Sequence, residues 1–465
     1  MRHSVTPAPI TVLDLFSGCG GFTQGFHEFR SDTRAAVDGP AFSSLAAVEH
    51  DRSAAATYAA NFGSLAGADE ADRARVYVGD IELWKPTDAE LQAEVIVGGP
   101  PCQGFSGLNR EKVGAERNSL WREYVRIVSI VKPKIFVIEN VERFLRSSEF
   151  DDLLTEISPG GILADYRLVD PIGASPGDSP KKRAGRYVLN SADYGAVQAR
   201  RRAIVIGVRK DCERGELLHY PSPTHASRSK IAKDQQRLFD SESAKLLQWN
   251  PVDGVFDESS RLRIRGTDLP DAWEWFQEVE DKVRGVFTTR DLHIGRNPEP
   301  LSLARYEAIR RGGNRNDLRD KWFTVDESGK TRILDTASLP GVSTPVEYLS
   351  TESWDNHKSG SGDVMGRVRL GDPSVTIRTE FYKPEKGRYL HPIKNRPITH
   401  YEAARIQGFP LDFKWCGTKV AIAKQIGNAV PIPLGRAIAS ALHACLRGSA
   451  AAESGGRAGE LNPRL

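Results

Sequence analysis

The stretch ITVLDLFSGCGGF at residues 10–22 decides the fold of this chain. Its first half is an apolar run typical of a buried strand, and residues 17–21 form a glycine loop that leads into a helix. Glycines let a backbone approach a ligand closely, and free N–H groups at a helix N-terminus bind polar or negative groups. A tight turn would also explain the loop. The stretch therefore predicts an α/β unit without assigning its ligand.

Two further apolar strands end next to carboxylates. Residues 46–48 lead to Glu49, and residues 76–78 are followed by Gly79 and Asp80. Carboxylates at successive strand ends can accept hydrogen bonds from ribose hydroxyls and from an adenine amino group, although a solvated strand end would explain each one alone. The loop is neither Gly-x-Gly-x-x-Gly nor a Walker motif, which argues against a pyrophosphate. An adenosine-containing cofactor without phosphates fits better.

A fourth strand, residues 95–97, runs into GGPPCQGFS at residues 98–106 and places Cys102 just past its end. Open α/β sheets bind ligands beyond the carboxyl ends of their strands, and a thiolate there can act as a nucleophile. A lone cysteine is more often a buried structural residue than a nucleophile. Two later elements favour the nucleophile: Glu139-Asn-Val after a fifth strand, and Gln198-x-Arg-x-Arg. A glutamate beside a cysteine suits general acid work on a ring nitrogen.

Taken together, these blocks resemble the C5-cytosine DNA methyltransferase family, of the restriction-modification or orphan type found in bacteria. The matching blocks are the cofactor loop at 14–22, the Pro-Cys loop at 98–106, the substrate-base motif at 139–141, the Gln-x-Arg-x-Arg element at 198–202, the late helix motif at 396–410 and the closing motif at 425–431. They occur in the order of the family and span about half the chain. The resemblance implies an α/β fold with a Rossmann-like S-adenosylmethionine-dependent methyltransferase domain and a smaller, irregular target-recognition domain.

The resemblance also implies a reaction and a set of site residues. Cys102 would attack C6 of a cytosine flipped out of duplex DNA, Glu139 would act on N3, and a methyl group from S-adenosylmethionine would be transferred to C5. Arg200 and Arg202 would hold the flipped nucleotide and flanking phosphates. The residues carried over as cofactor contacts are Phe16, Gly18, Gly20, Glu49, Asp80, Ile81, Leu120 and Asn428.

The length of 465 residues suggests two domains. We expect a catalytic domain at 1–210 plus 395–446, a target-recognition domain at 211–394 and a disordered tail at 447–465. Residues 365–396 carry eight Lys/Arg against three Asp/Glu and include Phe381, Tyr382 and Tyr389. This composition predicts a DNA-facing surface.

The overall composition is consistent with this interpretation. The chain has no long apolar run and no signal-peptide core, so we expect a soluble cytoplasmic protein, nucleoid-associated if the source is a prokaryote. Five cysteines without CxxC spacing argue against a disulfide framework or a metal site. With a net charge of only +3, local patches must bind the double-stranded DNA partner. A restriction endonuclease acting on the same site is a candidate partner, and a monomer is adequate for the chemistry.

Three alternatives remain open from the sequence. An RNA (tRNA) cytosine-5 methyltransferase could use the same cysteine and glutamate, although the large middle segment favours DNA. An inactive homologue could act as a DNA-binding or regulatory module. A Rossmann-type dehydrogenase would share only the first strand and loop, and it leaves the later blocks unexplained.

Overall fold

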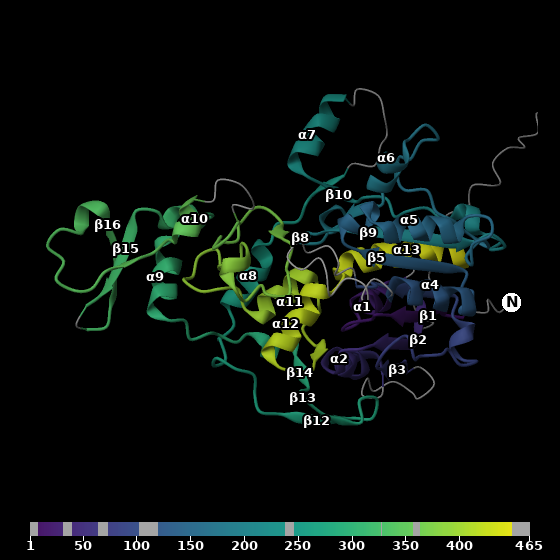
Figure 1. The fold of residues 1–465 in the computed structure, drawn as a ribbon, viewed down its shortest axis with the longest axis horizontal. Coiled ribbons are helices and arrows are strands. Elements are labelled where there is room, and N and C mark those ends of the chain that lie inside the picture. The colour runs from purple at the N-terminus through teal and green to yellow at the C-terminus, as the bar shows by residue number, and fades with distance from the viewer. Residues whose placement is uncertain are drawn as a thin grey trace, which may run out of the picture.

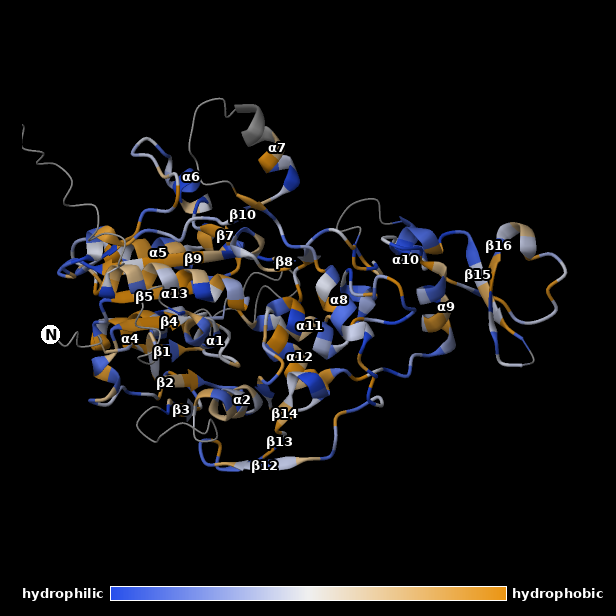
Figure 2. Cartoon of the chain, turned by 180° about the vertical axis from the view of Figure 1, so that it is seen from behind, coloured by the Kyte–Doolittle hydropathy of each residue, from blue (hydrophilic) through white to orange (hydrophobic). Residues whose placement is uncertain are grey.

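A computed structural model describes residues 8–30, 40–63, 73–101, 120–237, 246–326, 328–356 and 363–448 of the chain. A large α/β part holds the N-terminal elements, and a smaller lobe with α9, β15 and β16 lies at the opposite end of the molecule (Figure 1). Hydrophobic residues concentrate in the strands of the large part and in the helices that cover them (Figure 2). The site described below lies in the large part.

The centre of the large part is an eight-stranded sheet with the order β3-β2-β1-β4-β5-β9-β6 and with β7 paired to β9. Its first five strands are parallel, so their carboxyl ends meet at one edge: β1 Ile10–Leu15, β2 Phe42–Glu49, β3 Arg75–Val78, β4 Val95–Gly98 and β5 Ile135–Asn140. The antiparallel strands are β9 Arg201–Arg209, β6 Tyr166–Leu168 and β7 Val188–Asn190. The predicted α/β class is confirmed. Strand β2 begins at Phe42, so it includes part of the segment before residue 46.

Helix α13, Ile432–Arg447, returns from the far end of the sequence and packs against α1, Gly21–Glu28 (Figure 1). A methyl group on Gly25 would lie 2.9 Å from the backbone of Gly435, so two glycines allow the close approach. At the end of α13, Arg447 donates hydrogen bonds to the carbonyls of Ala8 (3.0 Å) and Pro9 (3.4 Å). The first and last described residues are therefore neighbours.

The remaining helices and strands complete the large part and form the smaller lobe. The helices are α2 Arg52–Phe62, α4 Leu120–Val131, α5 Ser148–Ile157, α6 Pro180–Gly185, α7 Arg228–Arg237, α8 Asp253–Ser260, α9 Pro300–Ala308, α10 Glu352–Asn356, α11 His400–Gln407 and α12 Lys419–Asn428. The strands are β8 Gln198–Ala199, β10 His225–Ala226, β11 Leu247–Gln248, β12 Trp273–Phe276, β13 Asp281–Arg284, β14 Phe287–Thr288, β15 Lys321–Val325, β16 Thr331–Asp335, β17 Glu347–Tyr348, β18 Ser374–Val375 and β19 Lys414–Trp415. Within the described part of the chain, no single helix is long and apolar enough to cross a membrane. The pair α12–α13, bent by 43°, meets that test by length and composition alone.

Buried side chains form three clusters, and the second of them crosses the domain boundary expected near residue 394. It joins α2 to residues 252–294 and to helices α11 and α12. Strand β8 also pairs with β18, so a segment of each expected domain contributes to one small sheet. The third cluster holds the lobe of α9 and β15. The division into 1–210 plus 395–446 and 211–394 stays a prediction.

Two buried arginines tie this lobe to the rest of the molecule. Arg367 donates hydrogen bonds to the carbonyls of Tyr306, Ile309, His391 and Lys394, and it is 3% exposed. Arg388, also 3% exposed, donates to three further carbonyls and to the carboxylate of Asp363. The aromatic side chains of Phe381 and Tyr389 are buried as well. For these four residues the predicted DNA-facing surface is wrong. The two arginines donate hydrogen bonds to carbonyls inside the protein, and the two aromatic rings pack in its interior.

Candidate active site

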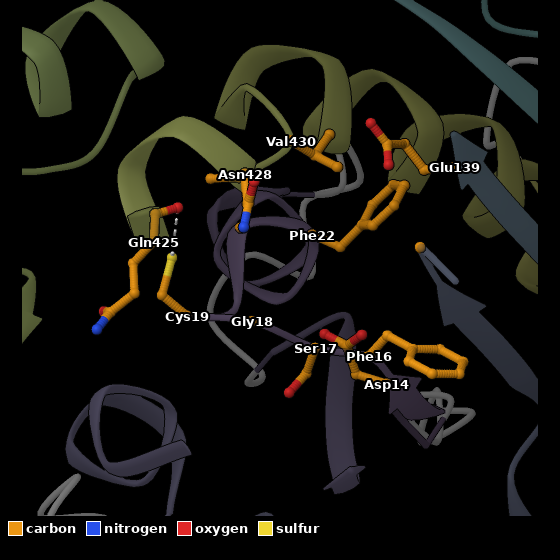
Figure 3. A pocket seen from close by; sticks show the side chains of 13 residues that line it. Asp14, Phe16, Ser17, Gly18, Cys19, Phe22, Glu139, Gln425, Asn428 and Val430 are labelled. Carbon is orange, nitrogen blue, oxygen red and sulfur yellow. Dashed lines mark hydrogen bonds between the residues drawn. The ribbon is translucent and has the colours of Figure 1, made fainter. Parts of the chain in front are cut away.

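A pocket lies at the edge of the sheet where the parallel strands end, and it holds about 440 Å³ of empty space. The loop after β1, the ends of β4 and β5, and the end of α12 all contribute to its wall. Asp14, Phe16 and Ser17 lie on one side of it, and Asn428 and Val430 lie across from them (Figure 3). The remaining lining residues are Gly18, Cys19, Gly21, Phe22, Gly99, Glu139, Gln425 and Ala429.

The glycine loop has the special backbone that its sequence predicts. Gly18 and Gly20 have positive φ angles of 54° and 85°, and Phe16 adopts a φ of 55°, which is uncommon for a residue with a side chain. A methyl group on Gly20 would lie 2.5 Å from a ring carbon of Phe62, so the loop is pressed against α2. The loop therefore turns away from β1 with its backbone toward the pocket.

The carboxylate of Glu49 holds this loop in place. It accepts hydrogen bonds from the backbone N–H of Gly18 and from that of Asp51, both at 2.8 Å. Burial raises the pKa of Glu49, although these two N–H donors oppose the rise. The carboxylate is thus fixed at the end of β2, next to the glycine loop.

Three of the expected cofactor contacts line the pocket, and five do not. Phe16, Gly18 and Asn428 are lining residues. Asp80 is exposed just after β3, where its carboxylate accepts from the N–H of Glu82 at 3.0 Å. The other four are Gly20 and Glu49 at the glycine loop, buried Ile81 after β3, and half-buried Leu120 at the start of α4.

Glu139 at the end of β5 is paired with Arg202. The Arg202 Nε lies 2.9 Å from Glu139 Oε1, and the two side chains are 14% and 12% exposed. Gly99 faces the other oxygen, since a methyl group there would lie 3.1 Å from Glu139 Oε2. The carboxylate is therefore held between a cation on β9 and the loop that follows β4.

Asn140 anchors the start of the Pro-Cys loop. Its buried Nδ2 donates a 2.9 Å hydrogen bond to the carbonyl of Pro100, and its Oδ1 accepts from the N–H of Val141 at 2.8 Å. This ties the loop after β4 to the end of β5. Cys102 lies outside the described residues.

The expectation that Arg200 contacts a nucleotide does not fit the geometry and is corrected here. Arg200 is 2% exposed, and its guanidinium donates to the carbonyls of Ile377 (2.9 Å), Gly427 (2.9 Å) and Asn428 (3.4 Å). Burial lowers its pKa to about 9. Arg200 thus joins the segment before α11 to the end of α12, and its guanidinium is directed at backbone carbonyls rather than at solvent. A sequence motif alone does not separate such an arginine from one that binds phosphate.

Sequence reasoning missed two pocket residues whose polar atoms are unsatisfied. Ser17 Oγ and Gln425 Oε1 are buried and have no hydrogen-bond partner among the described residues. Buried polar atoms in folded proteins almost always have partners, so Ser17 Oγ on the glycine loop fits a bound polar ligand, whereas the amide of Gln425 is held by the carbonyl of Cys416 at 2.9 Å. Both residues lie inside motifs that were recognised, but only the fold brings them together. No group of three or more His, Cys, Asp or Glu side chains in the described segments could hold a metal ion.

The comparisons with known proteins decide the family. The profile of the C-5 cytosine-specific DNA methylases matches residues 10–444. The chain belongs to this family. The methylase is 27% identical to the type II methyltransferase M1.HphI of Haemophilus parahaemolyticus, over 93% of this chain and 86% of that protein.

Two other similarities extend this result. The methylase is 27% identical to the DNA (cytosine-5)-methyltransferase PliMCI of Paracentrotus lividus over 94% of its own length, but it spans only 28% of that protein. Among solved structures, a prophage-encoded E. coli protein assigned to the DNA modification methyltransferases aligns over 94% of this methylase and 99% of its own chain, with a TM-score of 0.54 and 22% identity. At that identity, the likeness supports the fold alone.

Proposed function

We propose that this methylase transfers a methyl group from S-adenosylmethionine to C5 of a cytosine within a short sequence of double-stranded DNA. One observation carries the proposal. A single pocket is lined by the glycine loop after β1, by Gly99 of the Pro-Cys loop, by Glu139 and by Asn428 of the closing motif. Cofactor and base would therefore meet where these four motifs converge.

The residues present fit S-adenosylmethionine. Phe16 would stack on the adenine, Glu49 and Asp80 would accept hydrogen bonds from the ribose and the adenine amino group, and Ile81 and Leu120 would contact the adenosine. Gly18, Gly20 and Asn428 would face the methionine part, near Ser17, whose Oγ has no partner among the described side chains and backbone. When bound, S-adenosylmethionine supplies an electrophilic methyl group.

The chemistry assigned to the protein starts at Cys102. Its thiolate adds to C6 of the flipped cytosine, and Glu139 donates a proton or hydrogen bond to N3, so electron density moves to C5. After C5 has gained the methyl group, loss of the C5 proton and expulsion of the thiolate restore the ring. Arg202 keeps Glu139 oriented through the 2.9 Å contact.

The segment 211–394 would read the DNA sequence from a position beside the catalytic part. Flipping the base costs a few kcal/mol, which contacts to the surrounding duplex must offset. Because the type II relative M1.HphI is similar over most of both chains, a restriction endonuclease for the same site is a reasonable partner to seek.

The test is to incubate the purified protein and S-adenosylmethionine with unmethylated plasmid DNA and, separately, with unmodified tRNA, and to map 5-methylcytosine at base resolution. Methylation at one recurring DNA motif is the expected result. A signal only in tRNA would establish the RNA alternative, and no signal in either would reject the proposal.

A Cys102→Ser variant tests the covalent route. It should lose methyl transfer and keep S-adenosylmethionine binding near normal, because the cofactor contacts are elsewhere. DNA carrying 5-fluorocytosine at the mapped site should give an adduct with the unaltered enzyme that survives denaturation, since the fluorine cannot leave as a proton does. Retained turnover in the variant, or no adduct at a confirmed site, would rule out attack at C6.

A further inference from the structure

Asp14 is a carboxylate in the cofactor pocket: it is the first residue of the cofactor-loop motif at 14–22, yet it is not among the expected cofactor contacts and the proposed reaction gives it no role. It lies in β1, two residues before Phe16, and its side chain lines the pocket beside Ser17 (Figure 3). It is only 3% exposed. A buried carboxylate without a cation is costly, and no described Lys, Arg or His side chain pairs with it.

The groups around Asp14 supply hydrogen bonds but no positive charge. Thr23 Oγ1 donates to Asp14 Oδ2 at 2.8 Å, and Tyr58 lies 3.0 Å from the same hydroxyl, so the hydroxyl of Tyr58 donates to Thr23. The titratable groups that act on Asp14 or feel its charge are Glu49, Cys19, Tyr58 and Tyr124. Burial raises the pKa of all four, and none is a cation. The described groups therefore give Asp14 a hydrogen bond but no counter-charge, and only a ligand could supply one.

We propose that Asp14 is the counter-ion for the sulfonium of S-adenosylmethionine and that it makes the pocket prefer this cofactor over its uncharged product, S-adenosylhomocysteine. This inference rests on the proposed function. The two molecules share the adenosine and the amino acid part and differ by one methyl group and one positive charge. A carboxylate that meets the sulfonium discriminates between them, whereas contacts to the shared parts do not. Product inhibition is correspondingly relieved.

The proposal gives a definite pH dependence. Burial raises the pKa of Asp14 to about 7. A positive ligand favours the ionised carboxylate, so the preference for S-adenosylmethionine grows as the pH rises through this range and shrinks as the carboxyl is protonated below it. With such a pKa, the ionised fraction goes from about one tenth at pH 6 to about nine tenths at pH 8. Glu49 also has a raised pKa, but its expected ribose contact is common to both ligands.

Calorimetric titration of the full chain with S-adenosylmethionine and with S-adenosylhomocysteine tests the proposal without turnover. Between pH 6 and 8 the ratio of the two affinities should change by up to about tenfold. Titrations near pH 6.5 in buffers of different ionisation enthalpy should show release of about half a proton or more with the charged ligand and less with the neutral one. A pH-independent ratio with equal proton release would overturn the role of Asp14.

The isosteric variant Asp14→Asn should bind S-adenosylmethionine about tenfold more weakly, bind S-adenosylhomocysteine within about twofold of the parent protein, and lose the difference in proton release. Asp151→Asn, which removes an exposed carboxylate on α5, is the matched control and should change neither affinity. Equal losses for both ligands would make Asp14 merely structural. If the parent protein binds neither ligand, the proposed function fails together with this inference, whereas binding of both with no discrimination rejects Asp14 alone.

Discussion

Arg200 and Arg202 lie two positions apart in one motif and make different contacts. Arg200 points inward to carbonyls of Ile377 and Gly427, while Arg202 reaches Glu139 at the pocket. Successive side chains along a strand alternate in direction, so two residues separated by a single residue normally point to the same face. Arg200 and Arg202 do not, because they lie at the junction of β8 and β9, where the chain changes partner strands. The local backbone therefore sends two residues of the same type into different surroundings.

This difference predicts two distinct defects. Arg200→Gln leaves buried carbonyls unpaired and should lower the free energy of unfolding by about 3 kcal/mol. Arg202→Gln leaves a largely buried carboxylate without its cation, so it should also cost about 3 kcal/mol, and in addition it should slow methyl transfer about tenfold or more, because Glu139 loses the cation that orients it. Urea unfolding and single-turnover rates on the mapped DNA site measure both. Unaltered stability of Arg200→Gln would show that its contacts to the carbonyls contribute little.

The positions of most site residues could be predicted from the sequence, but their contacts could not. Apolar runs located the strand ends, so Glu49 and Glu139 fall at one sheet edge as the pattern implies. Charge composition was misleading at Arg367 and Arg388. An arginine that satisfies backbone carbonyls and one that binds phosphate look alike in a sequence, because only the fold determines where the carbonyls lie.

Among the structural elements, the α1–α13 pair joins the C-terminal part of the chain to its N-terminal part. Helix α13 comes from the end of the sequence, yet it packs on the helix that follows the glycine loop. A long helix with apolar positions at helical spacing, such as α13, is readable from the sequence. Its partner was not, since nothing local records that Gly25 and Gly435 face each other.

Gly25→Ala tests this contact. The added methyl group would lie 2.9 Å from the backbone of Gly435 and Arg436, and overpacking of this kind costs about 1–3 kcal/mol. Chemical unfolding should show that loss, with weaker S-adenosylmethionine binding because α1 begins at the glycine loop. Gly254→Ala, on the exposed face of α8 with no atom within 4 Å of the new methyl, is the matched control and should be neutral or slightly stabilising. Equal stability of both variants would contradict the close packing.

At the scale of the whole molecule, the lobe of α9 and β15–β17 depends on the buried arginines for its attachment. The single guanidinium of Arg367 donates to the carbonyls of Tyr306 and Ile309 in the lobe. It also donates to the carbonyls of His391 and Lys394 outside the lobe. The irregular sequence of this region gave no signal for the arrangement, since its short strands are set by long-range pairing rather than by periodicity.

Arg367→Met should loosen the lobe while leaving the cofactor pocket intact. Hydrogen exchange of backbone amides in α9 and β15 should become at least about tenfold faster, and S-adenosylmethionine affinity should stay within about twofold. Arg369→Met, which alters an exposed neighbour, is the control and should leave exchange unaltered. Unchanged exchange in Arg367→Met would mean that the apolar cluster around Leu318 and Phe323 holds the lobe without the arginine.

The contact of Arg447 with Ala8 and Pro9 has a consequence for how the gene could be rearranged. Because the two ends of the described chain touch, a short linker could join them, and the polypeptide could be reopened at an exposed turn such as that around Gly177. The resulting circular permutant keeps every strand pairing of the sheet. The linear order of the motifs is thus a property of the gene, while the catalytic architecture depends only on which segments end up adjacent.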